Sequence, residues 1–446
     1  MADVIIVGAG PAGIFAALEL SKRSPALDIV IIEQGKDIDE RSRTGSEMVI
    51  GWGGAGAYSD GKLTISTDVG GQLSSLLPED ELLSLLEEVD AVYSGYESSG
   101  KVFSINPDDA ASISARARLA GLVYVPTKVR HIGTENCYTI LKNLRETLGN
   151  KVRMIFNTRA VDIIKQQGRV TGVSLEDGTS IEAPFVIAAP GRVGSSWMSR
   201  QAKRLCLETR PNPVDLGVRV ELPAVVLKEL TDKAYETKFI YYSRTFDDRV
   251  RTFCMNPYGE VVRETLGDIL TVNGHSWANK RTENTNFAIL VSADFTEPFD
   301  DPIGYGESVA TMANMLGKGV IVQRLGDLLA GRRTTASRLS KCSTLPTLKQ
   351  ATPGDLSYCL PYRILTDIIE MLGCLDRLAP GVNSAHTLLY GIEVKFYSNR
   401  IRLDKDLETQ VAGLHVIGDG AGITRGLIQA SCSGIIAARS VLKKIN

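Results

Sequence analysis

The sequence has no excess charge of either sign, because 50 lysines and arginines nearly balance 52 aspartates and glutamates. A net charge of −2 supplies no basic field that would attract nucleic acid or an anionic membrane surface. No apolar run reaches about 18 residues, the length that a membrane-spanning helix needs, and no cluster of positive charges precedes the first apolar run. These absences predict a cytoplasmic protein with no transmembrane segment and no nucleic-acid partner.

The cysteines and histidines follow no metal-binding or redox pattern. Seven cysteines stand at positions 137, 206, 254, 342, 359, 374 and 432, with no C-x-x-C pair and no zinc-ligand spacing. We therefore expect free, mostly buried thiols in a reducing compartment, and no metal site. The absence of C-x-x-C also argues against disulfide reduction.

The amino terminus has the pattern of a dinucleotide-binding unit. The β-branched run at 3–7 predicts a strand buried on both faces. GAGPAG follows directly, and its glycines Gly8, Gly10 and Gly13 open a segment with helical apolar spacing. Gly8 permits the tight turn, Gly10 lets the backbone approach a pyrophosphate, and Gly13 allows close packing of helix on strand. Pro11 and Ala12 form the first helical turn, whose N–H groups favour phosphate.

The next predicted strand, residues 28–32, ends at Glu33, where such a unit places the acid that binds the adenosine ribose. Gln34 follows it and joins the expected cofactor contacts. A glutamate here, in place of an arginine, indicates an unphosphorylated ribose, as in FAD or NAD.

Two later strands also end in small residues. Residues 185–191, FVIAAPG, predict a buried strand that ends in Ala189 and Gly191, after a hairpin with turns at Gln167-Gly168 and Asp177-Gly178. Residues 414–422, LHVIGDGAG, predict another buried strand that ends in Gly418 and Asp419 and precedes a long helix. Taken in order, these elements resemble the FAD-binding domain of the glutathione-reductase-type flavoprotein superfamily.

This resemblance implies non-covalent FAD and several further contacts. The backbone of Val161 would meet the adenine, the strand ending at Ala189 and Gly191 would cross near the FAD, and the carboxyl-terminal segment would hold the pyrophosphate and flavin. Pro190 occupies the place of the usual threonine in this element. The residues expected in the carboxyl-terminal segment are Gly418, Asp419, Gly422, Thr424 and Gly426.

The stretch GWGGAGAYSDGKL, residues 51–63, is unusually rich in glycine. With other motifs in order along nearly the whole chain, it resembles a family of uncharacterised FAD-dependent dehydrogenases. The resemblance implies that its glycines approach the flavin, that Trp52 covers a ring or excludes water, and that Asp60 and Lys62 orient the flavin. The expected cofactor contacts here are Trp52, Gly53, Gly54, Ala55, Gly56, Asp60 and Lys62. The other matching motifs are VRHIGTENC at 129–137, GVRVELP at 217–223, FCMNPYGEVV at 253–262, TVNGHS at 271–276, GIEVKFYSNRI at 391–401 and GDGAG at 418–422.

The expected fold class is α/β, with a Rossmann-like FAD-binding domain made of a parallel sheet and a β-hairpin meander. Residues 1–70, 120–215 and 385–446 would form this discontinuous domain. Residues 71–119 would be a helical insertion. Residues 216–384, which begin with alternating strands and continue into helices, would form an α+β substrate domain.

The expected function is that of an FAD-dependent oxidoreductase, a dehydrogenase or reductase that transfers a hydride between flavin N5 and a small organic substrate. Candidate proton donors or acceptors are His275, Lys62 and Tyr258, and Arg219 is a further cleft candidate. No second GxGxxG unit is present, so an external reductant, either NAD(P)H or an electron-transfer protein, would reach the flavin transiently. A flavin monooxygenase and a non-catalytic binding module of the same fold are the alternatives.

Overall fold

The computed structural model describes residues 1–42, 45–59, 61–96, 101–234, 236–266, 268–276, 281–295, 298 and 301–445. The chain forms two compact units, each built from segments that are distant in sequence. The first unit contains Met1–Val102, Lys128–Asn212 and Tyr397–Asn446, and the second contains Phe103–Thr127 and Pro213–Phe396. The second unit is therefore inserted into the first at two places.

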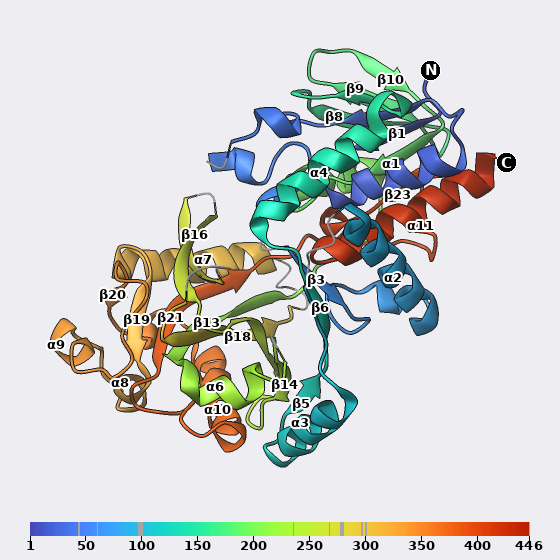
Figure 1. The fold of residues 1–446 in the computed structure, drawn as a ribbon. Helices are drawn as coiled ribbons and strands as arrows, with labels where there is room; N and C mark the ends of the chain where they lie inside the picture. Colours follow the sequence, from blue (N-terminus) through green and yellow to red (C-terminus); the bar gives the residue numbers. More distant parts are fainter. Residues whose placement is uncertain are drawn as a thin grey trace. The chain divides into compact units, whose positions relative to one another are not determined.

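A five-stranded parallel sheet forms the centre of the first unit. Its order is β23–β11–β1–β2–β7 (Figure 1). Four of these strands are buried along their whole length, as expected for a parallel sheet covered on both faces. The strands are β1 (Val4–Val7), β2 (Ile29–Ile32), β7 (Arg153–Ile155), β11 (Phe185–Ala188) and β23 (Leu414–Val416).

The helices of the first unit pack around this sheet, and two of them, α1 and α11, lie side by side (Figure 1). Their approach depends on small residues, because a Cβ at Gly434 on α11 would lie 2.2 Å from the carbonyl oxygen of Ala12 on α1. The helices are α1 (Pro11–Arg23), α2 (Glu79–Tyr96), α4 (Thr134–Leu148), α5 (Ser195–Leu205) and α11 (Leu427–Ile445).

Short antiparallel strands complete this unit: β3 (Lys62–Ile65), β6 (Lys128–His131), β8 (Ala160–Gln166), β9 (Arg169–Leu175), β10 (Ser180–Glu182), β12 (Thr209–Arg210) and β22 (Arg400–Ile401), with β4 (Lys101–Phe103) at the unit boundary. Turns at Gln167-Gly168 and Asp177-Gly178 join β8, β9 and β10 as expected. Arg153–Ile155 joins the parallel sheet as β7, because the chain turns at Asn157, where φ is 51°.

An eight-stranded sheet forms the second unit, in the order β20–β19–β21–β13–β18–β15–β14–β5. Adjacent strands in this sheet are antiparallel, except that β19 and β20 are parallel. The strands are β5 (Val123–Val125), β13 (Val214–Pro223), β14 (Lys238–Tyr242), β15 (Arg249–Asn256), β18 (Asn284–Ala293), β19 (Ile321–Arg324), β20 (Thr352–Pro353) and β21 (Leu388–Lys395). The parallel first sheet and this α+β unit confirm the expected fold class.

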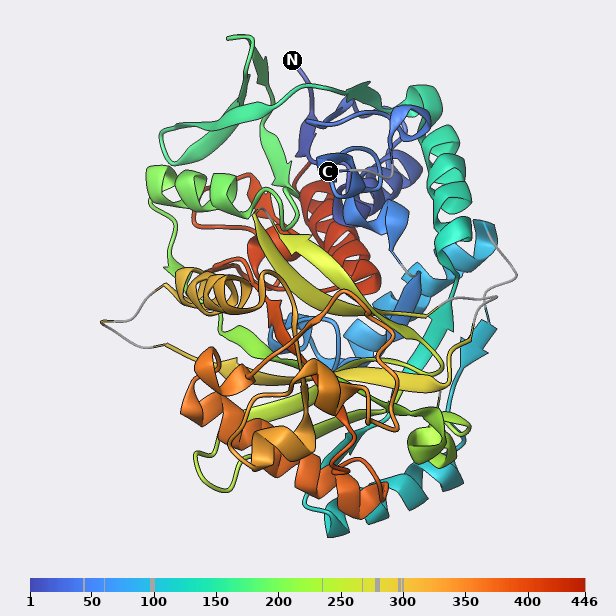
Figure 2. The ribbon, with the colours of Figure 1, turned by 90° about the vertical axis from the view of Figure 1, so that its left-hand side faces the viewer.

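The two faces of the eight-stranded sheet differ in chemistry. On β13, Val218 and Val220 belong to an apolar core that includes Ile368 of α10, whereas Arg219 and Glu221 point to the opposite, polar face. A hairpin of β16 (Glu260–Leu266) and β17 (Ile269–His275) lies on the side away from α3 and α10 (Figure 2). The helices of this unit are α3 (Pro107–Leu119), α6 (Ala224–Thr231), α7 (Pro302–Gly317), α8 (Leu325–Leu329), α9 (Ala336–Leu339) and α10 (Tyr362–Leu378).

Three segments lie elsewhere than the expected domain limits place them. Residues 120–127 and 385–396 were expected with the first domain, but β5 pairs with β14, and β21 pairs with β13 and β19, in the second unit. The expected helical insertion, 71–119, is divided between the units, with α2 in the first and α3 in the second. Local sequence does not reveal these assignments, because strand pairing is a long-range property. Among the described helices, none is both long and apolar enough to cross a membrane.

Asp367 on α10 provides a test of the second unit's packing. Its side chain is fully buried beside Asp248, which forms an ion pair with Arg363. Burial, with the neighbouring carboxylate of Asp248, raises the pKa of Asp367 to about 6 from its ordinary 3.8. The folded state then binds this proton more tightly than the unfolded chain does. Stability should therefore fall as the pH rises between these two values and stay lower above them.

Replacing Asp367 with asparagine removes the cost of a buried charge. D367N should raise the free energy of unfolding by about 1–3 kcal/mol near pH 8 and change it little near pH 4. Thermal unfolding at both pH values measures the difference. E307Q, which changes an exposed carboxylate on α7, is the control. An equal effect of D367N at both pH values would contradict the assignment.

Candidate functional site

The four segments selected from the sequence come together at one edge of the parallel sheet. Gly8 follows β1, Glu33 follows β2, Ala189 follows β11, and Gly418 lies two residues beyond β23. Because these strands are parallel and adjacent, their carboxyl ends share one edge. In open parallel sheets, ligands bind at this edge.

The turn from β1 to α1 is as compact as the three glycines suggest. Gly8 has φ of +104°, and a Cβ there would lie 2.2 Å from the carbonyl oxygen of Ala189. A Cβ at Gly13 would lie 2.0 Å from the carbonyl oxygen of Gly8. Gly10 is different, because a Cβ there would meet no described protein atom within 4 Å. Gly8 and Gly13 thus serve protein packing, while Gly10 leaves space at the amino terminus of α1, where Pro11 is the first helical residue.

Glu33 organises the backbone around this turn. Its carboxylate accepts hydrogen bonds from the N–H groups of Ala9 at 2.8 Å, Gly35 at 2.9 Å and Gly51 at 3.0 Å. The side chain is buried. The acid therefore ties the β1–α1 turn to the glycine-rich segment, in addition to any ligand contact.

The glycine-rich segment packs directly across the β1–α1 turn. The Gly53 N–H donates to the carbonyl oxygen of Ala9 at 2.7 Å. A Cβ at Gly54 would lie 3.2 Å from Cα of Gly10, and one at Gly56 would lie 2.9 Å from Cδ2 of Leu427. The bare backbone of this segment is thus explained at least partly by contacts within the protein. Ala55, between these glycines, is exposed.

Trp52 lies in the core of the first unit. Its side chain is completely buried, its indole N–H donates to the carbonyl oxygen of Leu141 at 2.9 Å, and its ring lies edge-on to Phe156. In this conformation the indole has no exposed surface that a flavin ring could contact. The structure therefore favours a packing role for Trp52 over the cofactor contact that we expected.

The segment after β23 places a second acid, Asp419, at this edge. The Gly418 N–H donates to Oγ of Ser433, and the Thr424 hydroxyl donates to Oδ1 of Asp419 at 2.8 Å. Burial raises the pKa of the Asp419 carboxyl, while Arg192, at 3.8 Å, and Thr424 act in the opposite direction. Hydroxyl or amide donors on a ligand would further stabilise the ionised form of this acid.

Several glycines nearby adopt conformations that other residues avoid. Gly191, Gly422 and Gly426 have φ of +61°, +72° and +80°. A Cβ at Gly191 or Gly426 would meet no described protein atom within 4 Å, whereas at Gly422 it would lie 2.6 Å from the carbonyl oxygen of Ser398. Gly191 and Gly426 thus leave space, and Gly422 serves packing. Helix α11 begins at Leu427, directly after Gly426.

The remaining predicted cofactor residues are more scattered. Val161 lies on β8, outside the parallel sheet, and its carbonyl oxygen accepts hydrogen bonds from Trp197 and Gln201. Gln34 is half-buried next to Glu33. Lys62 lies on β3 opposite His131 of β6. Asp60 lies outside the described residues.

Of the catalytic candidates, His275 and Tyr258 are neighbours in the second unit, whereas Lys62 belongs to the first. His275 is the last residue of β17, opposite Glu260 at the start of β16, and Tyr258 lies two residues before Glu260. His275 is exposed. The Arg281 guanidinium lies 5.1 Å from the centre of the Tyr258 ring, within range of a cation–π contact.

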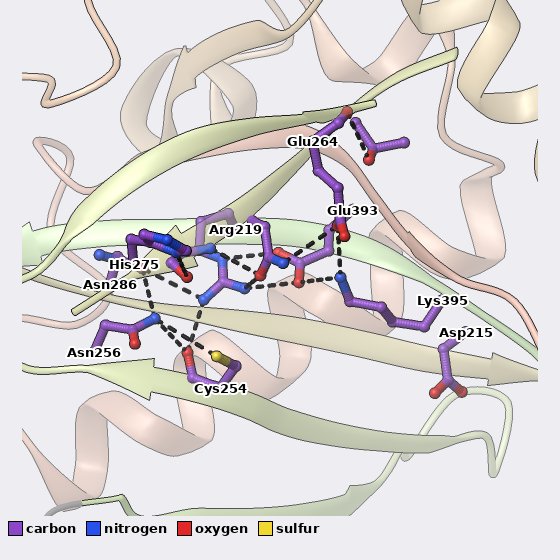
Figure 3. Close-up of polar contacts among 12 residues, drawn as sticks. Asp215, Arg219, Cys254, Asn256, Glu264, His275, Asn286, Glu393 and Lys395 are labelled. Carbon is purple, nitrogen blue, oxygen red and sulfur yellow. Dashed lines mark hydrogen bonds and ion pairs between the residues drawn. The ribbon is translucent and has the colours of Figure 1, made fainter. Parts of the chain in front are cut away.

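Arg219 lies beneath this hairpin and is fully buried (Figure 3). It forms a bidentate ion pair with Glu393 of β21, with distances of 2.8 and 2.7 Å. The guanidinium is thus occupied by protein partners, which favours a structural role over direct contact with a ligand. Among the described residues, no group of three or more histidine, cysteine, aspartate or glutamate side chains is arranged to hold a metal ion.

Comparison with known proteins identifies the family. Residues 3–265, more than half of the chain, match the model of the family described as FAD dependent oxidoreductase. The chain belongs to this family. Residues 213–396 also match a domain described as FAD-dependent protein, C-terminal domain-like, with limits close to those of the larger segment of the second unit. The protein is therefore an FAD-dependent oxidoreductase.

Individual relatives are distant. An uncharacterized protein of Clostridium beijerinckii is 26% identical over 482 aligned residues, which cover 99% of this chain and 81% of that protein. Quinol fumarate reductase of E. coli is 15% identical with a TM-score of 0.44, covering 99% of this chain and 70% of that one. L-proline dehydrogenase of P. horikoshii is 10% identical with a TM-score of 0.41, covering 99% and 94%.

The residues at the sheet edge fit FAD. Gly10 leaves open space that a Cβ would fill, N–H groups at the start of α1 suit a pyrophosphate, and Glu33 is an acceptor for ribose hydroxyls.

Sequence reasoning missed Arg41, whose guanidinium donates to the carbonyl oxygens of Trp52 and Gly54 and so orders the glycine-rich segment. No motif surrounds Arg41, so only the folded arrangement reveals this role.

The contrast between Gly10 and Gly13 gives a direct test. G10A should fold normally, because its φ of −76° suits alanine and no protein atom is displaced, but it should weaken FAD binding about 10–100-fold by crowding the ligand. G13A should lower the melting temperature even without FAD, because its Cβ collides with the Gly8 carbonyl. Fluorescence titration of the apoprotein with FAD, together with thermal unfolding, measures both effects.

G373A is the matched control. A Cβ at Gly373, on α10 of the second unit, would likewise meet no described atom within 4 Å. It should leave FAD affinity unchanged. If G10A binds FAD as tightly as the unaltered protein does, the ligand does not approach Gly10.

Proposed function

We propose that the first unit binds FAD in the manner of the glutathione-reductase-type superfamily, and that the second unit binds a small organic substrate. The protein would then be a dehydrogenase or reductase of the family of FAD-dependent dehydrogenases that its motifs resemble. The observation that carries this proposal is the meeting of the Gly8–Gly13 turn, Glu33, Ala189–Gly191 and Gly418–Asp419 at one sheet edge. When bound, FAD exchanges a hydride with an organic molecule.

In this proposal the first unit supplies binding and orientation. The N–H groups at the start of α1 hold the pyrophosphate, Glu33 accepts from the ribose, and Asp419 accepts from hydroxyl groups of the cofactor. Because Glu33 also holds three backbone N–H groups, the adenosine side of the site is organised before the cofactor binds. Such preorganisation limits the entropy lost on binding.

The second unit supplies the proton in this proposal. His275 is a residue type that can give or take a proton near neutral pH, and it is exposed at the end of β17. Tyr258 lies at the same end of the hairpin and is a second candidate. Lys62, on β3 of the first unit, would then balance the negative charge of the bound cofactor and not transfer the proton.

The reaction itself can be found with the cofactor's own absorbance. The purified protein is loaded with FAD, photoreduced without oxygen and mixed with a panel of metabolites that includes NAD⁺ and NADP⁺. A compound that restores the oxidised spectrum identifies the acceptor, and the reverse experiment identifies a donor. A protein that does not bind added FAD would contradict the proposal.

Substitution of His275 tests its role. H275N should slow the reaction with the identified substrate about 100–10,000-fold, because the proton-transfer group is lost, while FAD affinity stays the same. Stopped-flow absorbance measures the rate. H386N is the control, since His386 accepts a hydrogen bond from the Ser343 N–H within the second unit. A rate for H275N within about threefold of that of the unaltered protein would contradict the proton-transfer role of His275. Y258F would then test the second candidate, Tyr258.

A further inference from the structure

Arg219 uses every N–H group that it has. Nε and Nη2 donate to the two carboxylate oxygens of Glu393, and Nη1 donates to the carbonyl oxygen of Cys254 at 2.7 Å. The two remaining N–H groups donate to Oδ1 of Asn286 at 3.3 Å and to Oδ1 of Asn273 at 3.1 Å. A guanidinium has five N–H donors, so the hydrogen bonding of this buried charge is complete.

The bond to Asn273 closes a ring between the sheet and the hairpin. The amide of Asn273 on β17 donates to Glu264 of β16 at 3.2 Å, and Glu264 lies 3.3 Å from the ammonium group of Lys395. Lys395 also lies 3.4 Å from Glu393, which pairs with Arg219 (Figure 3). We call Arg219, Glu393, Lys395, Glu264 and Asn273 the five-residue ring. Its two positive and two negative charges cancel.

Gly274 allows the hairpin to approach this ring. A Cβ at Gly274 would lie 2.2 Å from Oδ1 of Asn286, 2.3 Å from Nδ2 of Asn256 and 2.7 Å from Nη1 of Arg219. Only glycine fits between these groups. At the two residues that precede His275, β17 is thus tied to Arg219 by the Asn273 side chain and packs closely against polar side chains of the sheet at Gly274.

Apolar side chains of the hairpin lie beside these polar groups, because Val272 directly precedes Asn273 and Val261 pairs with Gly274. Val261 and Val272 of the hairpin belong to a buried cluster with Val322, Leu388 and Tyr390 of the sheet. Apolar packing is non-directional, whereas the five-residue ring fixes distances and angles. The ring is therefore the part of the contact that sets the exact register of the hairpin on the sheet.

We propose that Arg219 and Glu393 are positioning residues that act through Asn273 and Gly274 to fix His275 for proton transfer. This inference rests on the role of His275 in the proposed function. A buried charge pair is weak evidence for stability alone, because an apolar pair of similar size often serves equally well. The hydrogen bond from Arg219 to the side-chain amide of Asn273, two residues before His275, supports a role in placement.

N273A is the sharpest test, because it cuts the ring on the hairpin side without leaving a buried charge unpaired. Hydrogen exchange measured by mass spectrometry on the FAD-loaded protein should show about tenfold faster exchange in residues 260–275 than in the unaltered protein. The chain has only four histidines, so their ring signals can be resolved by NMR. The His275 signal should move or broaden, while those of His131, His386 and His415 stay in place.

R219K is the second variant. It keeps the positive charge but loses the planar fork that joins Glu393 to Asn273. With the substrate found by the panel, both variants should lose about 10–100-fold in kcat, with KM changed less than about threefold, because the substrate still binds while the proton-transfer group is displaced.

R251K is the matched control, since the Arg251–Asp215 pair, at 2.6 Å, joins β15 to β13 within the same sheet. It should leave the hydrogen-exchange rates in residues 260–275 unchanged.

Unaltered hydrogen-exchange rates in N273A, or an equal increase of these rates in R251K, would overturn the inference. If the hairpin remains protected in N273A while H275N still abolishes the reaction, the positioning role fails and the proposed function stands. If N273A loosens the hairpin but H275N reacts normally, the proton role of His275 fails, and the positioning role fails with it.

Discussion

The close approach of helix α1 to strand β1 is the constraint on which the first unit depends. Gly13 lies against the Gly8 carbonyl, and Gly434 of α11 lies against the Ala12 carbonyl. These contacts bring α1 onto β1 and its turn, and α11 onto α1, at distances that a Cβ would prevent. The amino terminus of α1 is thereby fixed at the sheet edge where Glu33 and Asp419 also stand. In the proposed function this packing forms the cofactor site, because oriented N–H groups and two acids come to one place.

The glycines of the segment at 51–58 allow close packing within the protein, in addition to any contact with FAD. Its backbone packs over the β1–α1 turn through Gly53 and Gly54, and Arg41 holds its carbonyl groups. Trp52 faces inward and anchors the segment to Leu141. The cost in conformational entropy of so many glycines is therefore offset by contacts within the protein as well as by any contact with FAD.

The second unit differs from the first, because one face of its large sheet carries buried charged side chains. Alternation along β13 sends valines to the apolar core and Arg219 and Glu221 to the other face. The charges are tolerated because each has partners. Arg219 pairs with Glu393, and Glu221 accepts from Tyr390 and Thr347. The hairpin β16–β17 covers this polar face and carries His275 at its end.

The sequence alone determined the local elements, because their signals are local. Apolar and β-branched runs identified β1, β2, β11 and β23, and the glycine spacing with Glu33 predicted the dinucleotide-binding unit. Only the tertiary structure decided that Arg153–Ile155 extends the parallel sheet, that β21 lies in the second unit, that Trp52 faces the core and that Arg219 joins a ring with Asn273. Each of these depends on a partner far away in the chain, and pairing at such separation is set by the packing of the whole unit, which no short pattern of residues records.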